Sequence, residues 1–281
     1  MRVAIDIGGT TTRIARAPAD RPAIELIERM PTRSAFADEM VAIEGVLAGL
    51  PAGEISGIGV SVGARVARDG SRVAVAPNLR DYEGQPLAAR LAERFQVPVR
   101  LAHDTICGLL AEATSGALRG VDRAAYLTVS TGTGAAVRLG RDGAHVHLSI
   151  EFGHQLLAGN TLPCLCGQIG CVETLTGGRQ LAARYGREVE AIDDPRMWGE
   201  IVDALAIGIV NLGWLTRVER VALGGGIALG SRLLRERLPA RMAALRVGES
   251  PLELVWSALG ERAPLLGALA LLDTAESGIL H

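Results

Sequence analysis

Three cysteines and one histidine that could bind a metal lie close together in the second half of the sequence. Cys164, Cys166 and Cys171 fall within eight residues, and His154 precedes the first of them by ten residues. Zn²⁺ favours four tetrahedral sulfur and nitrogen ligands, and a Cys₃His set supplies them. Two glycines between the cysteines would let the loop turn back around an ion. Short CxC runs also occur as redox thiols, which would form a reversible disulfide, but the spacing favours a structural zinc site.

The remaining cysteine, Cys107, lies in an apolar run and is expected in the core. Without an evident set of disulfide partners, the chain suits a reducing compartment. The sequence opens with the strand-like Arg2–Ile7 rather than with a signal segment. The longest apolar stretch, Ile201–Leu215, is short for a bilayer and contains polar residues, which favours a buried helix. We therefore expect a soluble, cytoplasmic protein with no membrane partner.

Charge and composition narrow the function class. The chain has 281 residues and a formal net charge of −2, with 29 Lys and Arg against 31 Asp and Glu. We find no basic block, so nucleic acid is not expected as a partner. Hydrophobic residues make up 48% and aromatic residues only 3%, which predicts a core of Ala, Val, Leu and Ile. The length suits one large domain or two modest ones.

Three Gly-rich turns each follow an apolar, strand-like segment. They are Gly8-Gly9-Thr10, Gly132-Thr133-Gly134 and Gly224-Gly225-Gly226. Glycine lets backbone amides approach a ligand closely and Thr adds a hydroxyl donor, a combination that holds phosphates. One such turn usually means only a hairpin, but three together, the first led by Asp6, favour phosphate binding. None of them matches a Walker A or GxGxxG pattern.

The first two turns belong to a repeated pattern of strand, Gly/Thr turn and returning strand. The predicted strands are Arg2–Ile7 with Thr12–Ala17, and Ala124–Val129 with Ala135–Leu139. Helical spacing predicts helices near 36–50, 87–95, 104–116, 199–216 and 264–275. We therefore expect two related α/β lobes, 1–115 and 116–263, the second of which contains the zinc loop 154–171.

These motifs together resemble the ROK family of sugar kinases and their repressor relatives. The resemblance rests on Asp6-Ile7-Gly8-Gly9-Thr10, Ser130-Thr131-Gly132-Thr133-Gly134, Leu223-Gly224-Gly225-Gly226, and Glu151-Phe152-Gly153-His154 followed by CxCGxxGCxE. It implies an α/β, two-lobed actin-like ATPase (ribonuclease H-like) fold with a ligand cleft between the lobes. The final helix, about 264–281, would pack back on the N-terminal lobe. No helix-turn-helix segment precedes Asp6, so the kinase branch is expected rather than the repressor branch.

The resemblance also implies an activity and its residues. The reaction would be transfer of a phosphoryl group from ATP, with Mg²⁺, to the 6-hydroxyl of a hexose or N-acetylhexosamine, glucose or N-acetylmannosamine first among them. Asp104 stands where the family has its general base, although an Asp there would also suit a helix N-cap. Positions matching sugar-binding residues are Asn78, His103, Glu151, His154 and Glu173. Positions matching nucleotide-binding residues are Asp6, which would approach Mg²⁺ through water, Gly8, Gly9, Thr10, Thr11, Gly132, Thr133, Gly134, Gly224, Gly225 and Gly226.

By the same resemblance, His154 would bind Zn²⁺ through one nitrogen and face the sugar with the other, and the protein would form a homodimer. Several positions depart from the family pattern. His103 replaces the Asn that precedes the general base, Thr11 replaces a Lys, and Tyr82 replaces a Trp. Because imidazole differs from an amide in size and charge, His103 also leaves a non-catalytic sugar sensor on the same fold as the alternative.

Overall fold

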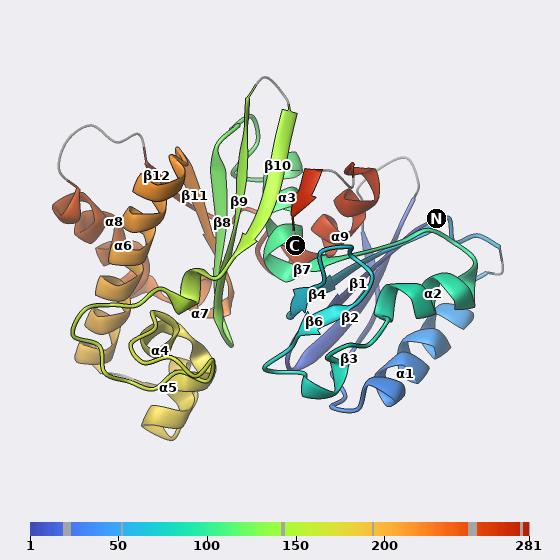
Figure 1. The fold of residues 1–281 in the computed structure, drawn as a ribbon, viewed down its shortest axis with the longest axis horizontal. Helices are drawn as coiled ribbons and strands as arrows, with labels where there is room; N and C mark the ends of the chain where they lie inside the picture. The colour runs from blue at the N-terminus through green and yellow to red at the C-terminus, as the bar shows by residue number, and fades with distance from the viewer. Residues whose placement is uncertain are drawn as a thin grey trace. The chain divides into compact units, whose positions relative to one another are not determined.

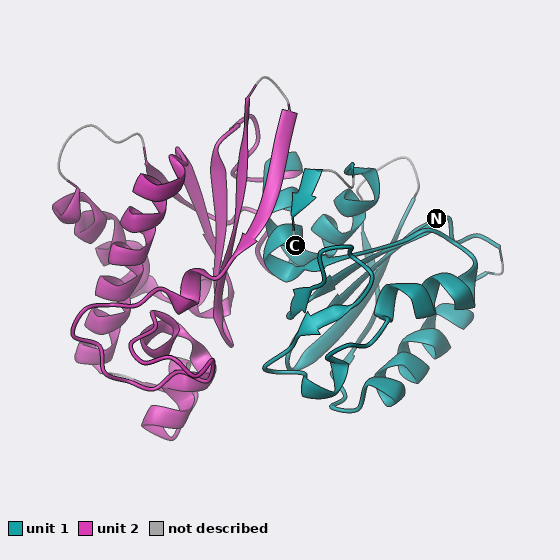
Figure 2. Cartoon of the chain, viewed as in Figure 1, with its two compact units in different colours: residues 1–114, 262–281 teal, residues 115–261 magenta. Residues whose placement is uncertain are grey.

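The computed structural model describes residues 1–18, 24–51, 53–141, 144–192, 194–246, 252–275 and 278–280. The chain forms two compact units (Figures 1 and 2). Unit 1 comprises Met1–Thr114 with Arg262–His281, and unit 2 comprises Ser115–Glu261. Each unit is built on a mixed β-sheet with helices, which confirms the predicted α/β class.

Unit 1 contains a five-stranded sheet in the order β3-β2-β1-β4-β7. Its strands are β1 (Arg2–Ile7), β2 (Thr11–Ala17), β3 (Glu25–Pro31), β4 (Gly57–Val62) and β7 (Val99–His103), and β5 (Arg65–Val66) pairs with β6 (Val73–Val75) in a small separate sheet. Its helices are α1 (Phe36–Ala48), α2 (Leu87–Phe95), α3 (Asp104–Ser115) and α9 (Ala263–Asp273). Strands β1, β2 and β3 are antiparallel, whereas β4 and β7 run parallel to β1.

In unit 2, five strands follow in the order β12-β11-β8-β9-β10. They are β8 (Ala124–Val129), β9 (Thr133–Arg141), β10 (Ala144–Ile150), β11 (Arg220–Gly224) and β12 (Glu253–Trp256). The helices are α4 (Glu173–Thr176), α5 (Gly178–Tyr185), α6 (Pro195–Thr216), α7 (Gly226–Gly230) and α8 (Arg232–Leu245).

Short 3₁₀ turns lie at Arg80–Tyr82, Phe152–His154, Val189–Ala191 and Gly260–Arg262, and a last strand, β13, covers Ile279–Leu280.

The two sheets have the same topology. In each, three antiparallel strands joined in sequence are followed by two strands parallel to the first of them: β1-β2-β3 with β4 and β7, then β8-β9-β10 with β11 and β12. The sequence predicted this repeat from the two strand–turn–strand segments alone. Because a parallel connection needs a crossover, each parallel strand is preceded by a helical segment.

The two faces of the unit 1 sheet differ in side-chain size. On one face, large residues of β1 and β4 such as Ile5 and Val60 pack against α1 and α2. On the other face, a Cβ on Gly59 of β4 would lie only 1.8 Å from the carbonyl oxygen of Ala268 in α9. The absence of a side chain at residue 59 therefore lets the backbone of α9 lie directly against the sheet.

Helix α9 is shorter than the sequence predicted. The predicted helix of about 264–281 ends at Asp273, because Thr274 takes extended backbone angles. The hydroxyl of Thr274 donates to the carbonyl of Ala270 and so satisfies one of the last carbonyls of the helix. Residues 276, 277 and 281 of the predicted helix lie outside the described residues.

Gly267 of α9 is a second close-contact position and gives a stability prediction. A Cβ there would lie 1.8 Å from the carbonyl oxygen of Cys107 in α3. Gly267→Ala is therefore expected to destabilise unit 1 by about 1–3 kcal/mol or more, since α3 and α9 must separate. Gly45→Ala in α1, where a Cβ would meet nothing within 4 Å, should instead stabilise by about 0.5–1 kcal/mol. Urea unfolding of both variants measures the difference, and equal effects would contradict this packing.

Helix α6 is the core helix of unit 2. Its length and composition would also suit a membrane span, which no other helix of the described residues does. However, its buried residues pack with the sheet and α8 in one hydrophobic core. The ring of Phe152 lies 2.7 Å from where a Cβ of Gly208 would be, and Leu252 lies equally close at Gly213. This packing agrees with the buried helix predicted from the sequence.

Candidate functional site

In unit 1, the predicted general base lies where three parallel strands end. The register aligns the last residues of β1, β4 and β7, so that the residues that follow them, Gly8, Gly63 and Asp104, are neighbours. A Cβ on Gly63 would lie 3.8 Å from both Oδ2 of Asp104 and Cα of Gly8. The carboxyl ends of parallel strands are the usual ligand sites of α/β sheets. The fold therefore brings the base and the first Gly-rich turn to one edge of the sheet.

The carboxylate of Asp104 does not cap helix α3. Its Oδ1 is buried, and none of the described residues donates a hydrogen bond to it, although Nδ1 of His103 lies 2.9 Å away. An N-cap role requires a bond from a backbone amide of the first turn. The side chain is 33% exposed, which leaves part of the carboxylate accessible to a hydroxyl. This geometry argues against the N-cap role, and the general-base role stays a prediction.

His103 is held by the residue after Asp104. The backbone amide of Thr105 donates to Nδ1 of His103 at 3.2 Å, and the Thr105 hydroxyl lies 2.7 Å from the same nitrogen. Oδ1 of Asp104 lies 2.9 Å from the same nitrogen, so the ring of His103 is held through Nδ1.

Asp6 is fixed by two residues that the sequence analysis did not single out. Arg13 donates to Oδ2 of Asp6 from Nη2 at 2.6 Å and from Nε at 3.2 Å, and Ser61 donates to Oδ1 at 2.8 Å. Burial raises the pKa of Asp6, while the charge and hydrogen bonds of Arg13 oppose that rise. The signal for Arg13 was available, because the predicted hairpin places it directly opposite Asp6.

The first Gly-rich turn is close to Asn78. The amide of Gly8 donates to the carbonyl of Thr11 at 3.0 Å, which closes the turn. A Cβ on Gly9 would lie 3.5 Å from Cβ of Asn78. Unit 1 therefore contains Asp6, the segment Gly8–Thr11, Asn78, His103 and Asp104 of the predicted site residues.

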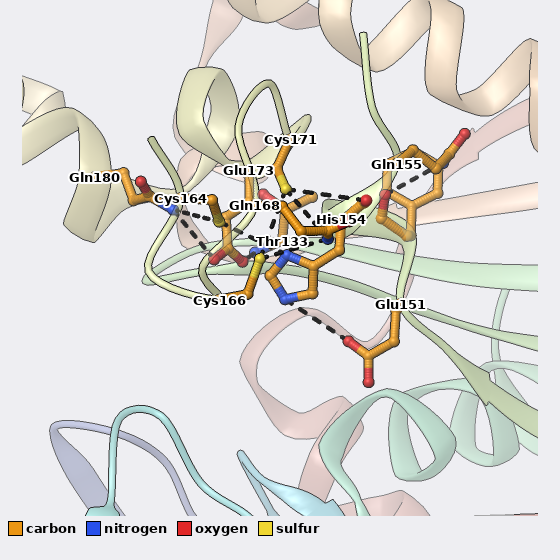
Figure 3. A network of polar contacts seen from close by, with 11 residues as sticks. Thr133, Glu151, His154, Gln155, Cys164, Cys166, Gln168, Cys171, Glu173 and Gln180 are labelled. Carbon is orange, nitrogen blue, oxygen red and sulfur yellow. Dashed lines mark hydrogen bonds and ion pairs between the residues drawn. The ribbon is translucent and has the colours of Figure 1, made fainter. Parts of the chain in front are cut away.

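In unit 2, the four predicted zinc ligands form a cluster (Figure 3). One ligand atom from each of His154, Cys164, Cys166 and Cys171 lies within 4.8 Å of all the others. Sγ of Cys166 is 3.7 Å from that of Cys171, and Sγ of Cys164 is 3.8 Å from Nδ1 of His154. Zn–S bonds of about 2.3 Å at tetrahedral angles would place two sulfurs about 3.8 Å apart. The donor set and its spacing therefore fit Zn²⁺.

Two glycines let the loop fold around this cluster. Gly167 and Gly170 have φ angles of +93° and +90°, which L side chains rarely adopt. The amide of Cys164 donates to the carbonyl of Gln168 at 2.8 Å, which brings the ends of the turn together. The loop takes this shape without a disulfide, because its three cysteines are free thiols.

The thiols of the cluster differ in acidity. Burial would raise the pKa of Cys166, but donors of Gln168 outweigh it and lower the pKa to about 7. Burial raises the pKa of Cys171 to about 12, and the neighbouring thiols add to the rise. Thiolates this close to one another repel, and a bound divalent cation would offset that repulsion.

Glu173 connects the cluster to the second Gly-rich turn. Its Oε2 accepts the backbone amide of Thr133 at 2.8 Å. Nε2 of Gln180 donates to Sγ of Cys164 at 3.3 Å and lies 3.5 Å from Oε1 of Glu173, so one amide touches both groups. No motif or spacing pointed to Gln180, which comes from α5. Glu173 is thus held in place by the loop and the turn together (Figure 3).

The carboxylate of Glu151 lies close to His154, one member of this cluster. Its Oε2 lies 3.8 Å from Nε2 of His154, the ring nitrogen that does not face Cys164 (Figure 3). The Glu151 side chain is 55% exposed and remains accessible to a ligand. A carboxylate and an imidazole in this arrangement can exchange hydrogen bonds with adjacent hydroxyls of a polyol.

The second and third Gly-rich turns lie together in unit 2. The amides of Gly178 and Arg179, at the start of α5, donate to the carbonyls of Ser130 and Thr131 at 2.8 and 2.9 Å. Gly225 has φ +90°, and a Cβ there would lie 2.3 Å from the carbonyl oxygen of Val129. The turns Gly132–Gly134 and Gly224–Gly226 are therefore neighbours at the ends of β8 and β11.

Comparisons with known proteins agree with this architecture. The chain is 27% identical to the kanosamine kinase of Amycolatopsis mediterranei, over 98% of this chain and 96% of that protein. It is 26% identical to the glucokinase of Thermotoga maritima, over 98% of both chains. These matches cover the full lengths of both relatives.

Solved structures show the same fold. A ROK family glucokinase from Streptomyces griseus, in complex with glucose and AMPPNP, matches with a TM-score of 0.78 at 23% identity, over 96% of this chain and 98% of that chain. A ROK family transcriptional regulator homologous to the Escherichia coli MLC protein matches with a TM-score of 0.79 at 19% identity, over 98% of this chain and 78% of that chain. The two-lobed actin-like ATPase fold predicted from the sequence is confirmed. Because the pattern of the ROK family also matches residues 2–275, the chain belongs to the ROK family.

Proposed function

We propose that this protein is an ATP- and Mg²⁺-dependent sugar kinase. Its acceptor would be the 6-hydroxyl of a hexose or N-acetylhexosamine, with glucose and N-acetylmannosamine first among the candidates. The observation that carries the proposal is the carboxylate of Asp104, which is accessible, does not cap its helix, and lies beside Gly8 where β1, β4 and β7 end. The kanosamine kinase and glucokinase relatives support the same reaction class.

In this mechanism, Asp104 takes the proton of the sugar hydroxyl. As the proton leaves, the hydroxyl oxygen forms a bond to the γ-phosphorus of ATP, and the bond from that phosphorus to the β–γ bridging oxygen breaks, which releases ADP. General-base catalysis of this kind contributes about 10²- to 10⁴-fold in rate. The imidazole of His103 and the amide of Asn78 would bind neighbouring hydroxyls.

The three Gly-rich turns would hold the triphosphate through their backbone amides, with Thr10 and Thr11 adding hydroxyl donors. Thr133 was also predicted to bind nucleotide, but its amide donates to Glu173 and its buried hydroxyl bonds to Thr176. Bound Mg²⁺ would neutralise charge on the phosphates. Asp6 is the residue proposed to hold its water shell, and Arg13 and Ser61 keep that carboxylate in one orientation.

His154, Cys164, Cys166 and Cys171 would bind a structural Zn²⁺, which cross-links the loop and takes no part in the reaction. The remaining nitrogen of His154, with the carboxylates of Glu151 and Glu173, would bind sugar hydroxyls. Glu173 supports this role because Gln180 and Thr133 already hold its side chain in place.

A coupled assay of ADP release tests the activity with glucose, fructose, mannose, N-acetylglucosamine and N-acetylmannosamine. We expect Mg²⁺-dependent ADP release with at least one of these sugars, and mass spectrometry should find the phosphate on the 6-oxygen. No sugar-dependent ADP release with any of the five would contradict the proposal.

A non-catalytic sugar sensor is the second candidate, and His103 favours it because it departs from the family's Asn beside the base. The likeness in fold to a ROK transcriptional regulator is compatible with this role. A sensor would gain thermal stability with a sugar but release no ADP. If His103 is what prevents catalysis in a sensor, His103→Asn should release ADP where the wild type does not. A kinase should release ADP already as the wild type.

We further propose that the enzyme acts in the cytoplasm, where its four free thiols would stay reduced, and that it forms a homodimer by analogy with the family. Sedimentation equilibrium of the purified protein measures the oligomeric state, and a monomer at micromolar concentration would contradict the dimer.

A further inference from the structure

On the basis of the function proposed above, we infer that Thr32 and Glu39 are positioning residues that hold two ligand-binding segments of unit 1 together. The first segment is the phosphate turn, Gly8–Thr10. The second is the Asn78 loop, Pro77–Tyr82. Through this connection, nucleotide bound at the phosphate turn and sugar bound at Asn78 would each strengthen the binding of the other.

Thr32 is bonded directly to the phosphate turn. Its hydroxyl donates to the carbonyl of Gly8 at 2.8 Å, and its backbone amide donates to the carbonyl of Thr10 at 3.1 Å. Both ends of the turn are therefore attached to one residue, which follows directly on β3. Both bonds use carbonyl oxygens of the turn, so Thr32 occupies none of its amides, although the amide of Gly8 already donates to the carbonyl of Thr11.

Glu39 of α1 anchors this arrangement from within the core. It is completely buried, and a buried carboxylate is stable only when its oxygens are hydrogen-bonded. Oε1 accepts the hydroxyl of Thr12, which in turn lies 3.0 Å from the hydroxyl of Thr32. Oε2 accepts the backbone amide of Arg33 at 2.9 Å. The buried carboxylate of Glu39 thus fixes both Thr12, which contacts the Thr32 hydroxyl, and Arg33, which follows Thr32 in the chain.

The same segment is bonded to the Asn78 loop. The hydroxyl of the buried Tyr82 donates to the carbonyl of Arg33 at 2.8 Å. The amide of Phe36, at the start of α1, donates to Oδ2 of Asp81 at 2.8 Å. The rings of Phe36 and Tyr82 meet edge to face with centroids 5.4 Å apart. Burial and the Glu39 carboxylate also raise the pKa of Tyr82, so its hydroxyl stays a donor.

These bonds form one continuous network from Gly8 to Tyr82 through Thr32, Arg33 and Glu39. The two segments also touch directly, since Asn78 lies against Gly9. A ligand that orders one segment therefore reduces the entropy that the other ligand must remove, which gives positive coupling between the two sites. Coupling of this kind is reciprocal in the two binding constants.

The variants Thr32→Val and Thr32→Ser test the role of the hydroxyl. Valine keeps the shape but cannot donate to Gly8, whereas serine retains the donor. The matched control is Thr274→Val, which removes a hydroxyl bond of similar length at the end of α9, away from both segments. We would measure KM and kcat for ATP and for the best sugar of the panel. Calorimetry would give the Kd of AMPPNP with and without that sugar. If the protein phosphorylates none of the five sugars, the sugar that raises the Tm of the protein most is used instead.

We expect the wild-type protein to bind AMPPNP more tightly with sugar present. Thr32→Val should raise the KM for both substrates by about five- to tenfold and remove most of the sugar effect on the Kd, as for loss of one well-placed hydrogen bond. Thr32→Ser should behave like the wild type. A merely structural role for Thr32 would lower Tm in Thr32→Val, as in Thr274→Val, without changing the ratio of the Kd values.

The outcomes separate this inference from the proposed function. Sugar-dependent ADP release with an unchanged Kd ratio in Thr32→Val would overturn the positioning role alone. AMPPNP binding that responds to sugar in the wild type and is lost in Thr32→Val, without any ADP release, would support the positioning role and contradict the kinase. Absence of AMPPNP binding, or of any sugar effect on it, in the wild type would overturn the inference.

Discussion

Replacing Asp104 with Asn should lower kcat by about 10²- to 10⁴-fold and leave sugar binding nearly unchanged. Asparagine has the same shape and can still meet a hydroxyl, but it cannot accept a proton at neutral pH. Oδ1 of Asp104 lies 2.9 Å from Nδ1 of His103, and an amide of the same shape can keep that contact, so the change should cost little stability. Steady-state kinetics gives the loss in kcat, and calorimetry with the sugar alone gives the retained affinity.

Asp69→Asn is the matched control for this variant, since Asp69 is an exposed carboxylate of unit 1 whose Oδ1 accepts the amide and the hydroxyl of Ser71. Its kcat should equal that of the wild type. Full activity in Asp104→Asn would exclude the base. If sugar binding is lost together with kcat, Asp104 would instead be a sugar-binding residue and not the general base.

The second large effect is expected from the metal cluster. The purified protein should contain one zinc ion per chain, and Cys171→Ser should lose it. Without the ion, the loop that holds Glu173 through Gln180 loses its cross-link. The KM for sugar should then rise by about 10- to 100-fold, as for loss of groups that orient a site, and Tm should fall. Atomic emission spectroscopy measures zinc content, and differential scanning calorimetry measures Tm.

Cys107→Ala serves as the control, because Cys107 is as fully buried as Cys171 but lies outside the cluster. It should retain zinc and sugar affinity. Removal of zinc from the wild type by a chelator should reproduce the effect of Cys171→Ser. A protein that holds no zinc, or whose sugar KM and Tm do not change when zinc is removed, would contradict the structural role.

The Gly-rich turns show how far local sequence determines a site. Gly8-Gly9-Thr10 and Gly132-Thr133-Gly134 follow apolar strands, and a strand, a tight turn and a returning strand define a hairpin without further information. The hairpin also fixes cross-strand pairs, so the pairing of Asp6 with Arg13 was open to prediction. The cluster of His154 with three cysteines was predictable for a similar reason, because the cysteines lie within eight residues of each other.

Contacts between distant segments were not open to prediction in this way. Periodicity does not reveal that a buried Glu39 reaches Thr12, or that Gln180 touches both Cys164 and Glu173. Each depends on how a helix packs against a strand or a loop, and no local pattern records that packing. Helical spacing predicted the last helix near 264–275, two residues beyond its observed end at Asp273, whereas the longer range of about 264–281 was wrong.

The sequence by itself determined the family, the repeated α/β order and the types of side chain at the site, since these depend on short motifs and on local periodicity. Only the tertiary structure decided where those side chains lie and what they contact. It left Asp104 without a capping bond, placed it beside Gly8 and Gly63, and drew the loop around four ligand atoms. The physical reason is that hydrogen-bond satisfaction and close packing depend on atoms far apart in the chain, which come together only when the sheets form.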